Sequence, residues 1–193
     1  MKSPPAFQSW LERQPLPWRI GQVAILPGYG LRHAEDLNRE NLRKVESLAA
    51  LREIVKFDMK GNFRPLRAAP TLQSGWEMGG LDLAGLVEAL DTIYPAAVAN
   101  WALREAGRLE VTEYRETAER QTGRFAIVKT LTETQVGELV SDICAKGCLK
   151  KRLWSPLSEI QNPPSEIPLW CPEACNFFIG KAREKIKGPA EEE

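Results

Sequence analysis

The segment that decides the fold of the second half of this chain is TETQVGELVSDICAKGC, residues 132–148. Its apolar residues recur at helical spacing: Val136, Leu139, Val140 and Ile143. This pattern predicts a helix that starts at Thr132 and presents one apolar face to a core. The helix leads into Cys144, and Gly147 lets the backbone turn before Cys148.

The chain has four cysteines, in two pairs that share the spacing C-x3-C. The first pair is Cys144 and Cys148, the second is Cys171 and Cys175, and residues 149–170 separate them. Four paired thiols are typical of a site that binds a metal or an iron–sulfur cluster. In a reducing compartment such pairs are more often metal ligands than disulfides, so we expect a bound metal centre. Two disulfides or unliganded thiols are the alternatives.

The spacing of the cysteines favours an iron–sulfur cluster over zinc. Zinc sites mostly use C-x2-C or C-x4-C pairs, whereas a cluster spreads its ligands over a wider body than one ion does. Zinc stays as the alternative, and four cysteines suit either a [2Fe–2S] or a [4Fe–4S] cluster.

The surroundings of the pairs support a cluster. Aromatic residues that can shield it from solvent are Trp154, Trp170, Phe177 and Phe178. Basic residues that can offset its negative charge, or dock an acidic electron-transfer partner, are Lys146, Lys150, Lys151 and Arg152. Ordinary core packing and a solvated basic loop are the alternatives. Pro172 suits the first turn of a helix, so we expect Cys171 near the N-cap, where the helix dipole favours negative charge.

Composition limits the partners and the location. The chain has 193 residues, 43% of them hydrophobic, with 26 basic and 26 acidic residues. A net charge of zero gives no reason to expect binding to nucleic acid or to an anionic membrane. The N-terminus lacks the apolar run of a signal peptide, and no stretch approaches the roughly 18 apolar residues of a membrane span. We therefore expect a soluble protein of the cytoplasm.

The predicted fold class is α+β, with a small strand-and-loop part over residues 1–81. We expect a helix over 4–13, a buried strand over 23–26, helical turns over 35–50 and a β-hairpin over 54–66, centred on a Lys-Gly-Asn turn.

A helical, cysteine-bearing part is predicted to follow over residues 82–180. Asp82 is expected to cap one helix, and a second is expected from Pro95 to Gly107. A strand is predicted over 124–129, and residues 181–193 are expected to form a charged, frayed tail.

Two groups of motifs run along the chain. The first group is LREIV (51–55), FRPL (63–66), APTL (69–72) and Gly75-Trp76. The second group is IYPAA (93–97), YRETA (114–118), RQTG (120–123) and the four cysteines. The first resembles the stabilising domain of certain bacterial proteins that carry a sirohydrochlorin cobaltochelatase-like domain at their N-terminus. The second resembles their C-terminal [4Fe–4S] domain, so that the resemblance covers roughly residues 20–180.

This resemblance implies one [4Fe–4S] cluster on Cys144, Cys148, Cys171 and Cys175. It also implies a link to tetrapyrrole or cobalamin metabolism, with a chelatase-like or other redox protein as partner. The motifs of the chelatase domain are absent and His33 is the only histidine, so chelatase activity is not implied.

Three arginines are candidates for binding a tetrapyrrole-type ligand: Arg115, Arg120 and Arg124. A guanidinium group binds carboxylate oxygens through paired hydrogen bonds. The alternative is a solvent-facing helix in which Glu116 pairs with Arg120.

The sequence supports three functional hypotheses. The first is an iron–sulfur protein that transfers electrons or serves as a redox accessory module. The second is a zinc-stabilised interaction module without a redox role. The third is an enzyme with a substrate pocket at Arg115 and Arg120, although we find no set of catalytic residues that would define its reaction.

Overall fold

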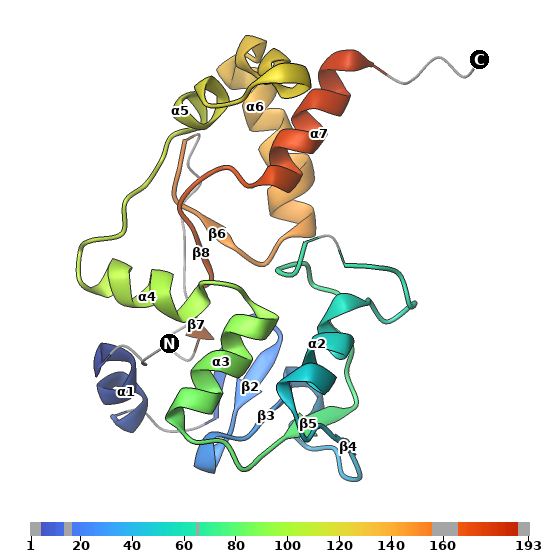
Figure 1. Ribbon diagram of the computed structural model, residues 1–193, viewed down its shortest axis with the longest axis vertical. Helices are drawn as coiled ribbons and strands as arrows, with labels where there is room; N and C mark the ends of the chain where they lie inside the picture. The colour runs from blue at the N-terminus through green and yellow to red at the C-terminus, as the bar shows by residue number, and fades with distance from the viewer. Residues whose placement is uncertain (1–4, 14–16, 65, 156–165, 189–193) are drawn as a thin grey trace. The chain divides into compact units, whose positions relative to one another are not determined.

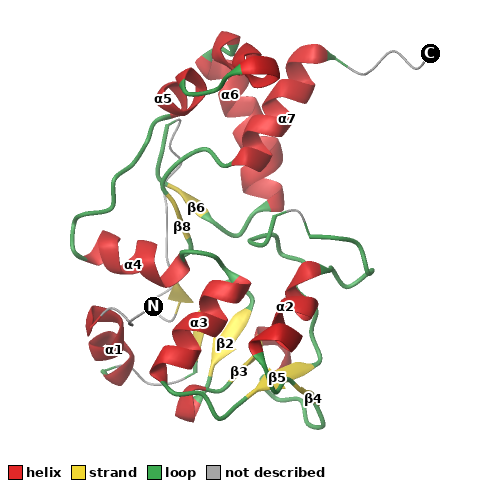
Figure 2. Ribbon diagram, viewed as in Figure 1, coloured by secondary structure: helices red, strands yellow, loops and turns green. Residues whose placement is uncertain are grey.

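The computed structural model describes residues 5–13, 17–64, 66–155 and 166–188. The chain forms two compact units. Their described residues are 5–109 with 166–169 in the first unit, and 110–155 with 170–188 in the second. A six-stranded sheet lies in the first unit, and helices dominate the second, which confirms the α+β class (Figure 2). The sequence places a boundary near residue 81, whereas the first unit continues to residue 109.

The sheet of the first unit has the strand order β4-β5-β3-β2-β1-β7 (Figure 1). Its strands are β1 (Trp18–Ile20), β2 (Val23–Ile25), β3 (Leu31–His33), β4 (Arg43–Lys44), β5 (Trp76–Met78) and β7 (Glu166–Ile167). The predicted strand at 23–26 is thus confirmed as β2. Gly21 makes the turn between β1 and β2 with a positive φ of 55°, and an added Cβ would lie 2.8 Å from the Tyr94 ring. Strand β7 pairs in parallel with β1, so a late segment of the chain completes a sheet begun at its start.

Four α-helices belong to the first unit: α1 (Pro5–Glu12), α2 (Leu48–Lys56), α3 (Leu83–Ile93) and α4 (Ala97–Glu105). The helices predicted at 4–13, after Asp82 and before Gly107 correspond to α1, α3 and α4. The carboxylate of Asp82 accepts the backbone N–H of Gly85, as an N-cap should.

Two predictions for the first unit are wrong. Residues 35–50 form a 3-10 turn (Ala34–Asp36), strand β4 and only the start of α2, which is capped by the Ser47 hydroxyl. The predicted hairpin over 54–66 reduces to one isolated bridge between Phe57 and Phe63, because its first arm is the end of α2. Ile54 and Val55 lie on the buried face of that helix; a short apolar run does not distinguish helix from strand.

The second unit contains α5 (Tyr114–Glu119), a 3-10 segment η3 (Gly123–Thr130), α6 (Glu133–Leu139), the π-helical turn η4 (Val140–Ala145) and α7 (Asn176–Lys187). A two-stranded parallel sheet joins β6 (Lys151–Arg152) to β8 (Trp170–Cys171). The helix predicted from Thr132 is confirmed as α6 and η4, and Thr132 and Gln135 form a reciprocal capping box.

Two predictions for the second unit need correction. The strand expected over 124–129 is the 3-10 segment η3. The tail expected over 181–193 is helical as far as Lys187, and residues 189–193 lie outside the described part of the chain.

Three aromatic rings form the centre of the second unit's core. Trp154 and Phe178 are each 1% exposed, and their rings meet edge-on at a centroid distance of 5.2 Å. Tyr114 meets Phe178 at 6.0 Å and donates its hydroxyl to the carbonyl of Val128. This core supports the segments that carry the cysteines. In the described residues, no helix is long and apolar enough to cross a membrane.

Candidate metal centre

The first cysteine pair lies where α6 gives way to a wider turn. Cys144 belongs to the π-helical η4, a local widening of the helix that often occurs at functional sites. Cys148 follows after Gly147, and its sulfur accepts the backbone N–H of Lys150 at 3.4 Å. The end of one helix therefore positions both thiols, as the sequence indicated.

The second pair brackets a short loop between β8 and α7. Cys171 ends β8, and its thiol donates to the carbonyl of Glu173 at 3.1 Å. Cys175 is the N-cap residue of α7, so the expectation that Cys171 lies near the N-cap is wrong. The helix begins after the loop rather than at Pro172, whose carbonyl accepts the N–H of Thr112 at 2.9 Å. It is thus Cys175 that lies at the positive end of a helix dipole.

Burial raises the pKa of three of the four thiols, and neighbouring thiols add to each rise. The pKa of Cys144 rises to about 12, and the other three cysteines contribute to this rise. The pKa of Cys148 rises to about 11, with further contributions from Cys171 and Cys175. Each of the four thiols is half-buried. Thiols with raised pKa values ligate as thiolates when a positive metal centre offsets their charge.

Two groups beside the thiols fit an anionic centre. The indole N–H of Trp154 is buried. Burial raises the pKa of the nearby Cys171, and the Trp154 side chain opposes that rise, as a donor close to the sulfur would. Arg152 is only 9% exposed and acts electrostatically on Cys144. A buried cation and a buried donor beside the sulfur suit a negatively charged thiolate site.

Within the described ranges, no three His, Cys, Asp or Glu side chains lie close enough to share one metal ion.

The three candidate arginines have different surroundings. Arg120 forms an ion pair with Glu173 at 3.1 Å, and so links α5 to the loop between Cys171 and Cys175. The guanidinium of Arg124 lies over the ring of Phe125, 5.1 Å from its centroid.

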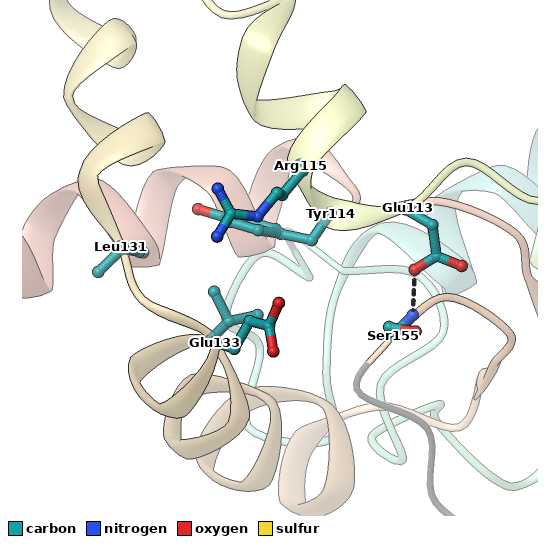
Figure 3. Close-up of a pocket in the computed structure, with 7 residues that line it drawn as sticks. Glu113, Tyr114, Arg115, Leu131, Glu133 and Ser155 are labelled. Carbon is teal, nitrogen blue, oxygen red and sulfur yellow. Dashed lines mark hydrogen bonds between the residues drawn. The ribbon is translucent and has the colours of Figure 1, made fainter.

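Arg115 lines a cavity of about 470 Å³ in the second unit. The other lining residues are Glu113, Tyr114, Leu131, Glu133, Val136 and Ser155. Figure 3 shows the side chains of Arg115 and Glu133 on opposite sides of this space, and the Glu113 carboxylate accepting the N–H of Ser155 at 2.6 Å. Neither Arg115 nor Glu133 has an ion-pair or hydrogen-bonded side-chain partner among the described residues. Arg115 also borders a shallow hollow that it shares with Arg120.

Family models match the two parts of the chain. The DR2241 stabilising domain matches residues 5–105, and a 4Fe-4S iron-sulfur cluster binding domain matches residues 106–184. The chain therefore belongs to the family of the DR2241 stabilising domain, and its C-terminal part is a 4Fe–4S cluster-binding domain.

A solved structure agrees with this assignment. The crystal structure of DR2241 from Deinococcus radiodurans superimposes with a TM-score of 0.81 at 33% sequence identity. The match covers 94% of this chain but 40% of DR2241, so this chain spans less than half of that protein's length. DR2241 is described as a multi-domain protein with structural similarity to chelatases and two additional novel domains. Among curated proteins no match is found.

Proposed function

We propose that this protein binds one [4Fe–4S] cluster through Cys144, Cys148, Cys171 and Cys175 and works as a redox module. One observation carries the proposal: the segment that matches a 4Fe–4S cluster-binding domain holds four half-buried cysteines, and a buried arginine acts electrostatically on two of them. When bound, the cluster supplies a carrier that accepts and releases one electron.

The chain's own residues hold and shield this carrier. The four thiolates ligate it, and Cys175 does so at the N-terminus of a twelve-residue helix, where the dipole favours negative charge. Trp154 and Phe178 close the apolar side of the site. Because each cysteine is half-buried rather than enclosed, the site keeps an edge near solvent through which a partner can exchange electrons.

The proposed partner is a chelatase-like protein or domain that handles a tetrapyrrole-type substrate. The support is the structural similarity of DR2241 to chelatases. We further propose that the protein works in the cytoplasm, because a reducing compartment keeps four cysteines free to bind a cluster.

The redox role predicts a reversible change in the anaerobically purified protein. Dithionite should bleach the absorption near about 400 nm and produce the electron paramagnetic resonance signal of a reduced cluster. Reoxidation should restore the absorption. A cluster that neither reductant nor oxidant changes without loss of iron would contradict electron transfer and leave a structural role.

The cavity beside α5 supports a second activity, the binding of a carboxylate ligand by Arg115. Its volume of about 470 Å³ lies in the range of small-molecule sites, and Arg115 has no ion-pair partner among the described residues. We expect Arg115→Ala to weaken binding of uroporphyrin, a carboxylate-bearing tetrapyrrole, by about tenfold or more, because a charge-assisted hydrogen bond contributes about 1.5–3 kcal/mol.

Binding of uroporphyrin is best followed by fluorescence titration, with iron content measured in parallel. The matched control is Arg43→Ala, which removes an exposed arginine from the first unit. Equal affinity in the Arg115→Ala and Arg43→Ala variants would exclude the cavity as the binding site.

A further inference from the structure

We infer that Arg152 is the counter-charge of the bound cluster, that it raises the reduction potential of the cluster, and that it favours retention of the cluster by the protein. This inference rests on the proposed function, since it needs a cluster on the four cysteines. It assigns Arg152 a positioning and tuning role rather than that of a ligand.

The backbone fixes Arg152 beside the second cysteine pair. Arg152 and Cys171 are Cα partners in the parallel pairing of β6 with β8. The next residue, Leu153, donates its N–H to the carbonyl of Cys171 at 3.0 Å. The position of Arg152 relative to Cys171 is therefore set by strand pairing and not by a flexible surface loop.

The guanidinium group is held in place by Trp154. Nη1 of Arg152 donates to the Trp154 carbonyl at 2.6 Å, and the guanidinium carbon lies 5.0 Å from the centroid of the Trp154 ring. That ring is itself packed against Tyr114 and Phe178. Arginine suits this stacked position because its planar group combines a ring contact with fixed hydrogen-bond donors.

Among the described residues, no salt bridge joins Arg152 to a carboxylate. The acidic groups that act on it are the thiols of Cys144 and Cys171 and, to a lesser degree, the exposed Glu113. Burial lowers the pKa of Arg152, although arginine keeps its proton in proteins. Burying a cation without a counter-ion is costly, and the cost is offset once neighbouring thiols become thiolates around a cluster.

The lysines near the cysteines do not share this position. Lys146, for example, is 71% exposed and pairs with Asp142 at 2.9 Å, so solvent screens its charge. Of the four basic residues expected from the sequence to offset cluster charge, Arg152 is the buried one.

Two consequences follow from this geometry. A fixed positive charge favours the reduced cluster, which carries one more negative charge than the oxidised cluster, and therefore raises the potential. The same charge stabilises the loaded protein more than the metal-free protein, so by linkage it favours retention of the cluster.

The test compares Arg152→Gln and Arg152→Lys with the wild type in spectroelectrochemical titrations. We expect Arg152→Gln to reduce the equilibrium constant for cluster reduction about tenfold, which corresponds to a potential lower by about 59 mV for one electron. Arg152→Lys, which keeps the charge, should retain most of the potential. The matched control is Arg183→Gln, which removes a guanidinium on α7 that lies 5.4 Å from the Phe125 ring centroid. The potential of this variant should not change.

A second measurement separates tuning from a purely structural role. Arg152→Gln should speed iron loss to a chelator about tenfold while leaving the urea midpoint of the metal-free protein unchanged or higher, because a buried unpaired charge has been removed. An unchanged potential in a loaded Arg152→Gln variant would overturn the inference. The inference would also be overturned if the Arg152→Gln variant failed to fold, or if its metal-free form were destabilised as much as its loaded form. Failure of the proposed function gives a different result, because the wild-type protein itself would then lack iron.

Discussion

Replacing Cys171 by serine is expected to lower the iron content of the purified protein at least about tenfold and to unfold much of the second unit. Loss of even a residue outside the ligand shell typically costs about 10–100-fold in metal affinity, and loss of a ligand costs more. Cys171 also ends β8, so its surroundings are ordered by the same site that it helps to form. Iron analysis and circular dichroism of anaerobically purified protein measure both effects.

The same loss is expected for Cys144→Ser, Cys148→Ser and Cys175→Ser, because a four-thiolate site has no spare ligand. Ser141→Ala is the matched control, since Ser141 is exposed and lies on the same helical turn as Cys144. It should retain the iron. Full iron content in all four serine variants would show that the ligands lie elsewhere.

Phe178→Ala is expected to destabilise the second unit by about 3–5 kcal/mol, the usual cost of removing a fully buried aromatic side chain. Phe178 is 1% exposed, and its ring lies between those of Tyr114 and Trp154. It also belongs to α7, the helix that Cys175 caps. Urea unfolding of the iron-loaded protein, followed by tryptophan fluorescence, gives the free energy of unfolding.

An exposed phenylalanine provides the comparison for this variant. Phe63 is 67% exposed in the first unit, so Phe63→Ala should change the free energy of unfolding by less than about 0.5 kcal/mol. A loss below about 1 kcal/mol for Phe178→Ala would contradict the three-ring core and, with it, the support of the cysteine segments.

The features that the sequence predicted correctly depend on local signals. The helix after Thr132 combines an apolar period with a capping box, and both are properties of adjacent residues. Asp82 ahead of an apolar run is a cap signal of the same kind. The two cysteine pairs predict a 4Fe–4S centre, and the match of residues 106–184 to a 4Fe–4S cluster-binding domain agrees with that cofactor.

The features that the sequence did not reveal depend on contacts between distant residues. Pairing of β7 with β1 brings Glu166 opposite Arg19, and no local pattern encodes that partner. Arg64 appears in the sequence as one more surface cation, yet it is 3% exposed and donates to three backbone carbonyls: those of Val55, Arg67 and Ala69. Which loop carbonyls need a hydrogen-bond donor depends on the folded path of the loop, so the sequence does not show it.

The candidate site shows the same division. The four cysteines are predicted as ligands from their count and spacing alone, whereas the position of Cys175 as N-cap depends on where α7 begins in the folded chain. Arg152 differs from the neighbouring basic residues in being buried. The sequence alone does not show which residue of a basic segment is buried.

The central claim is one [4Fe–4S] cluster on the four cysteines, and the most direct test is the iron, sulfide and zinc content of protein purified without oxygen. The account predicts about four iron and four sulfide per chain, with a brown colour and absorption near about 400 nm. Stoichiometric zinc without sulfide in colourless protein would contradict it, and would make the cysteine-bearing unit a structural metal module.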